Sequence, residues 1–156
     1  MNLHEFKRII LEYHREINEN VNTAFRFLGV NYGLTMLQFR LLMEIYRQGP
    51  HTIGSLAEAC GIAGANISTM CKKLEKQGFV RRMRDQTDER VVRIRLTDFG
   101  EGTIREIDRY LNDKLTRILA NEAEETFEMI TAGMGKISSL LLKMGSDDEG
   151  EAGETP

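Results

Sequence analysis

Polar side chains suited to reversible hydrogen bonding are concentrated near the middle of the sequence, at helical spacing. Asn66 has an amide that donates and accepts, and hydroxyl groups follow at Ser68 and Thr69. Amides and hydroxyls recognise the edges of nucleic-acid bases, whereas ammonium groups contact phosphates without reading sequence. Together they form a candidate surface for a polyanion, made of Gly64, Ala65, Asn66, Ser68, Thr69, Lys72 and Lys73.

A second polar group follows in an arginine-rich segment. Arg90 has the long cationic side chain that inserts into the narrow minor groove of A·T-rich DNA. Asp88 is placed to orient the Arg90 guanidinium through a charge-assisted hydrogen bond, and Arg84 adds a further positive charge. The sequence contains no nucleophile elbow, Walker loop, Rossmann fingerprint or zinc-protease signature. The chemistry indicated is therefore binding, and we expect no enzymatic activity.

The charge of the chain is unevenly distributed. The whole sequence has a net charge of −3, which by itself argues against a nucleic-acid partner. Residues 72–95, however, contain nine basic and four acidic side chains, a local net charge of +5. A basic patch on an acidic protein steers a polyanion to one face. A solvated surface without a partner is the alternative interpretation of the same charges.

The elements that position these groups follow from periodicity and turn residues. Thr52 caps a predicted short helix that runs to about Ala59, Gly61 lies at the apex of a turn, and a second helix runs to about Gln77. Small Ala57 permits a close crossing of the two helices, and Ile67 fills their interface, with Leu56, Met70 and Leu74 beside it. This pattern predicts a helix-turn-helix over residues 53–74.

From Phe79 the hydrophobic period changes from helical to alternating. Residues 79–84 and 91–96 predict two strands joined by a polar hairpin tip, and Thr97 caps the next helix. The predicted order is αααα–ββ–αα, a mainly α fold with a small β-hairpin, known as a winged helix-turn-helix. We expect one domain over residues 1–145, a winged helix-turn-helix lobe at about 34–100, dimerisation helices at about 2–29 and 101–145, and a disordered acidic tail at 146–156.

The first and last predicted helices each have an apolar stripe with steps of three or four residues. A winged helix does not need these stripes for its own core, so they indicate a partner surface and a homodimer. Such a dimer reads two half-sites about 10 bp apart. Burial of the stripes within one chain is the alternative. The predicted dimerisation residues are Phe6, Ile10, Tyr13, Phe127, Ile130, Ile137 and Leu141.

Cysteine and histidine usage excludes other classes of site. Cys60 and Cys71 cannot form a disulfide framework, and no histidine lies at metal-ligand spacing from a cysteine or a second histidine, so we expect neither a metal nor a cofactor. No apolar run is long enough to span a bilayer, and the first residues do not form a signal peptide. We therefore expect a cytoplasmic protein with no membrane partner.

The segment around the helix-turn-helix resembles the multiple-antibiotic-resistance regulator (MarR) family. The resemblance spans residues 3–144 and is most specific at 74–82, at Asp85-x-x-Asp88-x-Arg90 and at 92–100. It implies a winged-helix homodimer that represses transcription, is released from a pseudo-palindromic operator by a small molecule, and has Arg90 at the wing tip. The sequence departs from the family pattern at Ala63, Thr69, Lys72 and Glu89, where Ser, Arg, Asp and Arg are frequent.

The resemblance also implies a ligand pocket between the dimerisation helices and the DNA-binding lobe. The side chains expected to border it are Tyr13, Arg15, Phe39 and Met43. Two other functions remain open at this point. One is a winged-helix protein–protein interaction module that does not bind DNA. The other is a thiol-based redox sensor using Cys60 or Cys71, although we expect Cys71 to be buried and structural.

Overall fold

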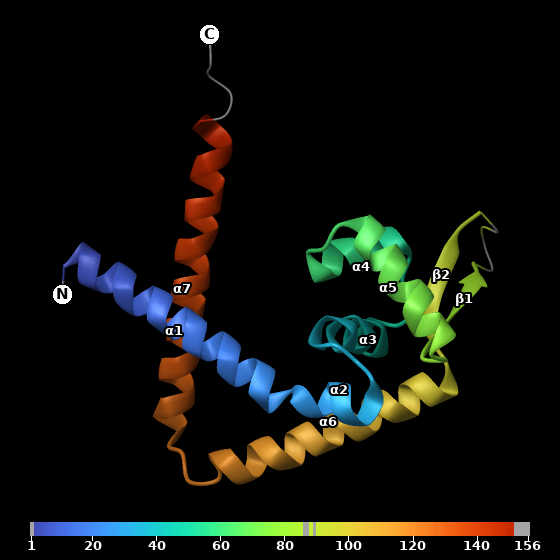
Figure 1. The fold of residues 1–156 in the computed structure, drawn as a ribbon, viewed down its shortest axis with the longest axis horizontal. Coiled ribbons are helices and arrows are strands. Elements are labelled where there is room, and N and C mark those ends of the chain that lie inside the picture. Colours follow the sequence, from blue (N-terminus) through green and yellow to red (C-terminus); the bar gives the residue numbers. More distant parts are fainter. Residues whose placement is uncertain (1, 86–87, 89, 152–156) are drawn as a thin grey trace. The chain divides into compact units, whose positions relative to one another are not determined.

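The computed structural model describes residues 2–85, 88 and 90–151, and the side chains of residues 144–151 lie outside the description. The described chain is mostly helical with one two-stranded antiparallel sheet, which confirms the predicted fold class (Figure 1). Its two compact units are residues 1–109 and 110–156. The elements in chain order are α1 (Leu3–Ala24), α2 (Arg26–Tyr32), α3 (Met36–Gln48), α4 (Ile53–Cys60), α5 (Gly64–Lys76), β1 (Val80–Arg84), β2 (Val92–Leu96), α6 (Asp98–Leu119) and α7 (Glu124–Glu151).

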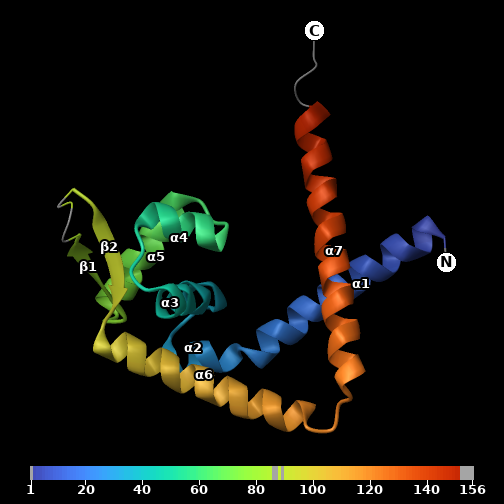
Figure 2. The same cartoon turned by 180° about the vertical axis from the view of Figure 1, so that it is seen from behind.

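The core of the first unit lies where α3, α4, α5 and the hairpin meet. Helix α4 packs on α3 and α5, and the hairpin packs on α5 and α3, so Figures 1 and 2 show the two strands beside α5. Branched aliphatic side chains fill this space and exclude water from it. Burial of each one stabilises the fold by about 2 kcal/mol. The side chains with no exposed surface include Leu41, Leu42, Leu56, Ile67, Leu74, Ile94, Ile104 and Ile107.

The predicted helix boundaries in this unit are largely confirmed by their caps. Thr35 and Thr52 each form a capping box, in which the Thr hydroxyl accepts the backbone N–H three residues later. Gly61 ends α4 with a left-handed backbone (φ 64°, ψ 38°) that side chains with a Cβ rarely adopt. The Thr97 hydroxyl accepts the N–H of Gly100 at 3.0 Å at the start of α6. Each cap contributes about 1 kcal/mol to helix stability.

The wing is tied to the linker between α3 and α4. Its strands pair from Val80↔Leu96 to Arg84↔Val92. On the outer edge of β2, His51 forms a bridge with Ile94: the His51 N–H donates to the Ile94 carbonyl at 3.1 Å, and the Ile94 N–H donates back at 2.6 Å. Residue 51 therefore acts as a one-residue third strand, a feature that the sequence periodicity did not predict.

The N-terminal part differs from the single helix predicted over residues 2–29. The helix is interrupted at Phe25 (φ −102°, ψ 6°), and α2 continues past Gly29 to a left-handed cap at Gly33. The Phe25 ring lies 6.5 Å from the ring of Phe39 on α3, and Leu28 is buried. After the interruption, α2 buries Leu28 in the core. The apolar stripe of α1 contains no buried residue.

In the second unit, α7 extends farther than predicted. The helix continues to Glu151, past Ser146, where the disordered tail was predicted to begin, and residues 152–156 lie outside the described part. The segment from residue 146 to 151 contains no proline that would stop a helix. None of the described side chains of α7 is buried within the single chain. Across the described residues, no helix combines the length and hydropathy that a membrane crossing requires.

Candidate nucleic-acid interface

Helix α5 has two faces of opposite character. Ile67, Cys71 and Leu74 have no exposed surface and form its inner face. The predicted polar residues lie on the other side: Gly64, Ala65, Asn66, Thr69, Lys72 and Lys73 are exposed, and Ser68 is half-buried. The Thr69 hydroxyl donates to the carbonyl of Ala65 at 3.0 Å, which leaves its oxygen free to accept. The structure therefore brings the predicted group together on one solvent-facing surface.

The start of α5 has no side-chain cap. Ala63 occupies the N-cap position, and its methyl group accepts no hydrogen bond, as its residue type predicts. The N–H groups of Asn66 and Ile67 bond to the Ala63 carbonyl at 3.0 and 3.2 Å, so the first turn is closed by the backbone. Helices lacking a capping side chain lose about 1 kcal/mol.

The end of α5 is joined to β1 by one carboxylate. Glu75 Oε1 accepts the backbone N–H of Arg82 at 3.2 Å, and Glu75 Oε2 lies 3.3 Å from the Arg82 Nε. The two side chains keep 39% and 37% of their surfaces exposed. Sequence reasoning counted Arg82 as one more positive charge and missed this contact, because the seven-residue separation fits neither helix nor hairpin spacing.

The wing tip is shaped by two aspartates. Asp85 pairs with the Nε of Arg93 on β2 and accepts the Asp88 N–H at 3.4 Å. Asp88 Oδ1 accepts the backbone N–H of Arg90 at 3.0 Å. The sequence predicted that Asp88 orients the guanidinium of Arg90. The contact that Asp88 makes is instead with the Arg90 backbone. A short carboxylate stabilises a turn in this way by capping a nearby N–H. Residues 86, 87 and 89, including the predicted departure at Glu89, lie outside the described residues.

Two of the exposed cations in this region form ion pairs. Arg82 and Arg93 are held by Glu75 and Asp85. Other exposed cations follow α5 and continue along the hairpin; they are Lys72, Lys73, Lys76, Arg81, Arg84, Arg90 and Arg95. Because α5 and β1 pack together, these charges belong to one lobe.

The comparisons with known proteins agree with this architecture. Residues 34–92 match the model of the MarR family, which covers the whole helix-turn-helix and most of the hairpin. A MarR family protein from Bacillus stearothermophilus is 26% identical, with a TM-score of 0.71 over 91% of this chain and 99% of that chain. The chain is thus similar to the MarR family over its helix-turn-helix.

Several curated proteins are similar to part of this chain. The helix-turn-helix-type transcriptional regulator YwaE of Bacillus subtilis is 28% identical over 110 residues, or 70% of this chain and 64% of the relative. In the next three relatives the match covers 44%, 59% and 56% of their length. The chain thus spans about half to two thirds of the first curated relatives. These relatives are named as regulators, none as an enzyme, in agreement with the sequence prediction.

A structure solved with bound DNA has a similar fold. Streptococcus pneumoniae FabT, solved in complex with DNA, has a TM-score of 0.76 over 88% of this chain and 99% of that chain. Its sequence identity of 20% makes it evidence for the fold alone.

The two thiols of this chain are not activated. Cys71 is fully buried, and burial raises the pKa of its thiol to about 11. Burial also raises the pKa of Cys60, which is half-buried near Arg40 and Glu44. A redox sensor needs an accessible thiol with a lowered pKa. The geometry therefore favours a structural role for Cys71, as predicted. Among the described residues, no group of three or more histidines, cysteines or carboxylates is placed to hold a metal ion.

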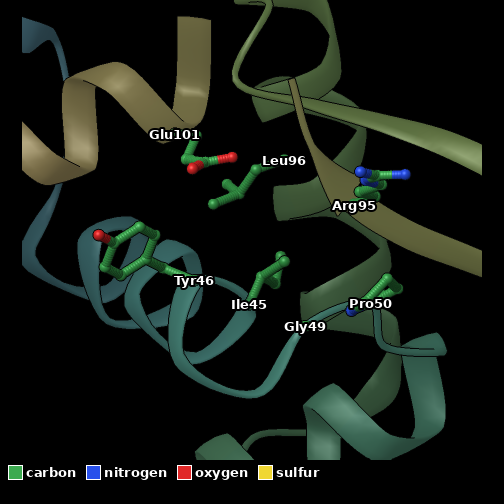
Figure 3. A pocket seen from close by; sticks show the side chains of 7 residues that line it. All are labelled: Ile45, Tyr46, Gly49, Pro50, Arg95, Leu96 and Glu101. Carbon is green, nitrogen blue, oxygen red and sulfur yellow. The ribbon is translucent and has the colours of Figure 1, made fainter. Parts of the chain in front are cut away.

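The residues predicted to line a ligand pocket are divided between two environments. Phe39 and Met43 are 7% and 8% exposed within the core, whereas Tyr13 is 60% exposed on α1 and Arg15 pairs with Glu19 at 3.2 Å. The structure does not bring these four side chains into one cavity of the single chain. An open cavity instead lies where α3, β2 and α6 meet, and its lining includes Tyr46, Leu96 and Glu101 (Figure 3).

Proposed function

We propose that this chain is a MarR-family transcriptional regulator that binds double-stranded DNA as a homodimer. One observation supports this proposal above the others: the exposed face of α5 and the hairpin tied to it present polar and cationic side chains on a single lobe. A helix flanked by a cationic hairpin has the dimensions to occupy a major groove and reach the neighbouring minor groove.

Helix α5 is the proposed major-groove element. Asn66 is exposed, and its amide can contact adenine through two hydrogen bonds. Ser68 and Thr69 contribute hydroxyl groups to the same surface. Lys72 and Lys73 lie toward the C-terminal half of the helix, where they would contact phosphates and set the position of the helix rather than its sequence preference.

The wing is the proposed minor-groove element. Arg90 is exposed beyond the paired strands, and its backbone is held by Asp88. Arg84 is exposed at the end of β1, on the same hairpin. A guanidinium inserted into a narrow A·T-rich groove gains from the enhanced negative potential there. The wing therefore adds a preference for groove shape to the base contacts of α5.

The terminal helices supply the proposed dimer interface. The 22 residues of α1 include no buried side chain, and Phe6, Tyr13 and Ile17 are exposed along one stripe. Helix α7 exposes a second stripe that contains Phe127, Ile130, Met134, Ile137 and Leu141. Apolar stripes of this length mark a partner surface. A two-fold dimer would present two α5 helices to half-sites about 10 bp apart.

Repression and release by a small molecule complete the proposal. A dimer bound across a promoter blocks access of the transcription machinery, and DNA binding selects one separation of the two lobes. A ligand that favours a different separation lowers DNA affinity through the coupled equilibrium. The support is the match of residues 34–92 to the MarR family model and the description of relatives as transcriptional regulators. Tyr13, Arg15, Phe39 and Met43 remain the proposed ligand contacts, and the cytoplasm is the proposed compartment.

The test measures dimer formation and duplex binding by the full chain. Light scattering gives the oligomeric state, and fluorescence anisotropy with an A·T-rich duplex of about three helical turns gives Kd at several salt concentrations. We expect a dimer whose log affinity falls linearly with log salt. Arg90→Ala should weaken binding by about 1–3 kcal/mol, roughly tenfold to a hundredfold.

Arg8→Ala is the matched control, because Arg8 is exposed on α1 and paired with Glu12 at 3.0 Å. It removes one arginine without touching the wing, so its Kd should equal that of the unmodified protein. A monomer, or a protein indifferent to duplex DNA at low salt, would refute the proposal and favour a protein–protein interaction module. If the unmodified protein binds duplex DNA, selection of bound genomic fragments would identify the operator.

A further inference from the structure

The two-stranded wing is attached to the rest of the lobe along both of its edges, at the same position. Arg82 on β1 faces Ile94 on β2 across the sheet. The outer edge of β2 is bonded there to His51 through two backbone hydrogen bonds. The outer edge of β1 is bonded there to Glu75 of α5, whose Oε1 accepts the Arg82 N–H at 3.2 Å.

Glu75 thus takes the place of a neighbouring strand. An edge strand presents unpaired N–H groups, and the N–H of Arg82 is satisfied by a side-chain carboxylate. The second oxygen of the same carboxylate lies 3.3 Å from the Arg82 Nε. Two contacts from one planar carboxylate fix direction as well as distance, which a single flexible ion pair does not.

We propose that Glu75 is a positioning residue for DNA binding, which sets the angle between α5 and the wing and so holds Arg84 and Arg90 in register with the groove. This inference rests on the proposed function. Arg84 is two residues beyond Arg82 on the same strand, so a tilt of β1 at Arg82 displaces Arg84 and the tip. Misplaced cations lose contacts with the phosphates even when their charge is unchanged.

The sign of the effect separates positioning from simple charge. Glu75 is an anion of the same lobe, and its removal raises the local charge by one. Electrostatics alone therefore predicts tighter DNA binding by a Glu75→Ala protein, with a steeper salt dependence. Positioning predicts weaker binding with a shallower salt dependence, because the wing no longer contributes its phosphate contacts.

The experiment compares Glu75→Ala, Glu75→Gln and Glu58→Ala as full-length dimers. Glu58 is exposed on α4, so its replacement changes the charge equally without touching the wing. Exposed ion pairs contribute little to stability, so all variants should fold, which circular dichroism and thermal unfolding check. Glu75→Gln retains an oxygen for the Arg82 N–H and loses the ion pair.

Kd is measured with one A·T-tract duplex and one G·C-rich duplex over a salt series. We expect Glu75→Ala to bind the A·T-tract duplex roughly tenfold more weakly and to lose most of its preference over the G·C-rich duplex. The Kd of Glu75→Gln should lie between those of Glu75→Ala and the unmodified protein. Glu58→Ala should bind as tightly as the unmodified protein or more tightly. In the Arg84→Ala/Arg90→Ala background, Glu75→Ala should have little further effect, because its partners in the groove are gone.

The outcomes separate this inference from the proposed function. An unmodified protein that does not bind either duplex contradicts the proposed function. Unmodified binding together with equal or tighter binding by Glu75→Ala contradicts the positioning role alone. A tenfold loss that persists undiminished when Arg84 and Arg90 are already absent also contradicts it, because the effect would then not pass through the wing.

Discussion

The winged lobe and the terminal helices have the same kind of sequence pattern and opposite packing. In the lobe, α3 buries Leu41, Leu42 and Ile45, and α5 buries Ile67 and Leu74. Helix α1 is as amphipathic as these helices and buries nothing. The comparison shows that an apolar stripe specifies that a helix has a partner, and not whether the partner lies in the same chain.

The largest effect is expected from a charge in the stripe of α7. Ile137→Glu places a carboxylate in the proposed dimer interface, where an unpaired buried charge costs about 3–5 kcal/mol. The dimer dissociation constant should rise more than a hundredfold by sedimentation or light scattering, while the circular dichroism of the lobe is retained. Ser139→Glu adds the same charge on the opposite face of α7 and should remain dimeric. Loss of the dimer in both proteins would argue against the stripe as the interface.

A core truncation in the lobe should come next. Leu74 has no exposed surface, and Leu74→Ala should lower the free energy of unfolding by about 2–5 kcal/mol in urea titration. Leu11 is 59% exposed on α1 and lies off its apolar stripe. Leu11→Ala should therefore change stability by less than about 0.5 kcal/mol. Equal losses from the two substitutions would mean that α1 is packed as tightly as the lobe.

Two glycines in the first turns of α6 should respond with opposite sign. A Cβ at Gly100 would collide with the Phe79 carbonyl oxygen and lie 3.1 Å from the Phe79 Cα, whereas a Cβ at Gly102 meets no atom within 4 Å. Gly100→Ala should destabilise the protein by about 1–3 kcal/mol. Gly102→Ala should stabilise it by up to about 1 kcal/mol, because alanine favours a helix interior. Thermal unfolding measures both, and stabilisation by Gly100→Ala would show that α6 can move away from Phe79.

The smallest effect concerns the thiols and leaves the fold unchanged. The pKa of Cys71 is about 11, and its sulfur is buried, so a thiol reagent at pH 8 should modify Cys60 first and Cys71 only after unfolding. A Cys60→Ser protein should therefore react slowly in native buffer and completely in denaturant. Rapid native reaction of Cys71 would revive the redox-sensing alternative.

Local signals in the sequence predicted much of the lobe. Thr52 and Thr97 cap the helices that they were expected to cap, and Gly61 has the left-handed turn conformation. Ala63 leaves α5 without a side-chain cap, as its residue type requires. These features depend on residues within four positions of each other, so a short window of sequence contains the physics that decides them.

Contacts between distant segments could not be predicted in this way. The interruption at Phe25 is accompanied by packing of its ring against Phe39 on α3. The bridge between His51 and Ile94, and the carboxylate of Glu75 on Arg82, form only once the helices and the hairpin are assembled. The predicted ligand residues stay a prediction, because Tyr13 and Phe39 lie in different environments of the single chain.

The separation of faces on α5 has a consequence for sequence change. Ile67, Cys71 and Leu74 hold the helix in place from one side, while Asn66, Thr69 and Lys72 are exposed on the other. Substitutions at the outer positions are therefore almost neutral for folding. The lobe can acquire a new binding preference by a few outer replacements without first gaining compensating stability, whereas each inner position tolerates few alternatives.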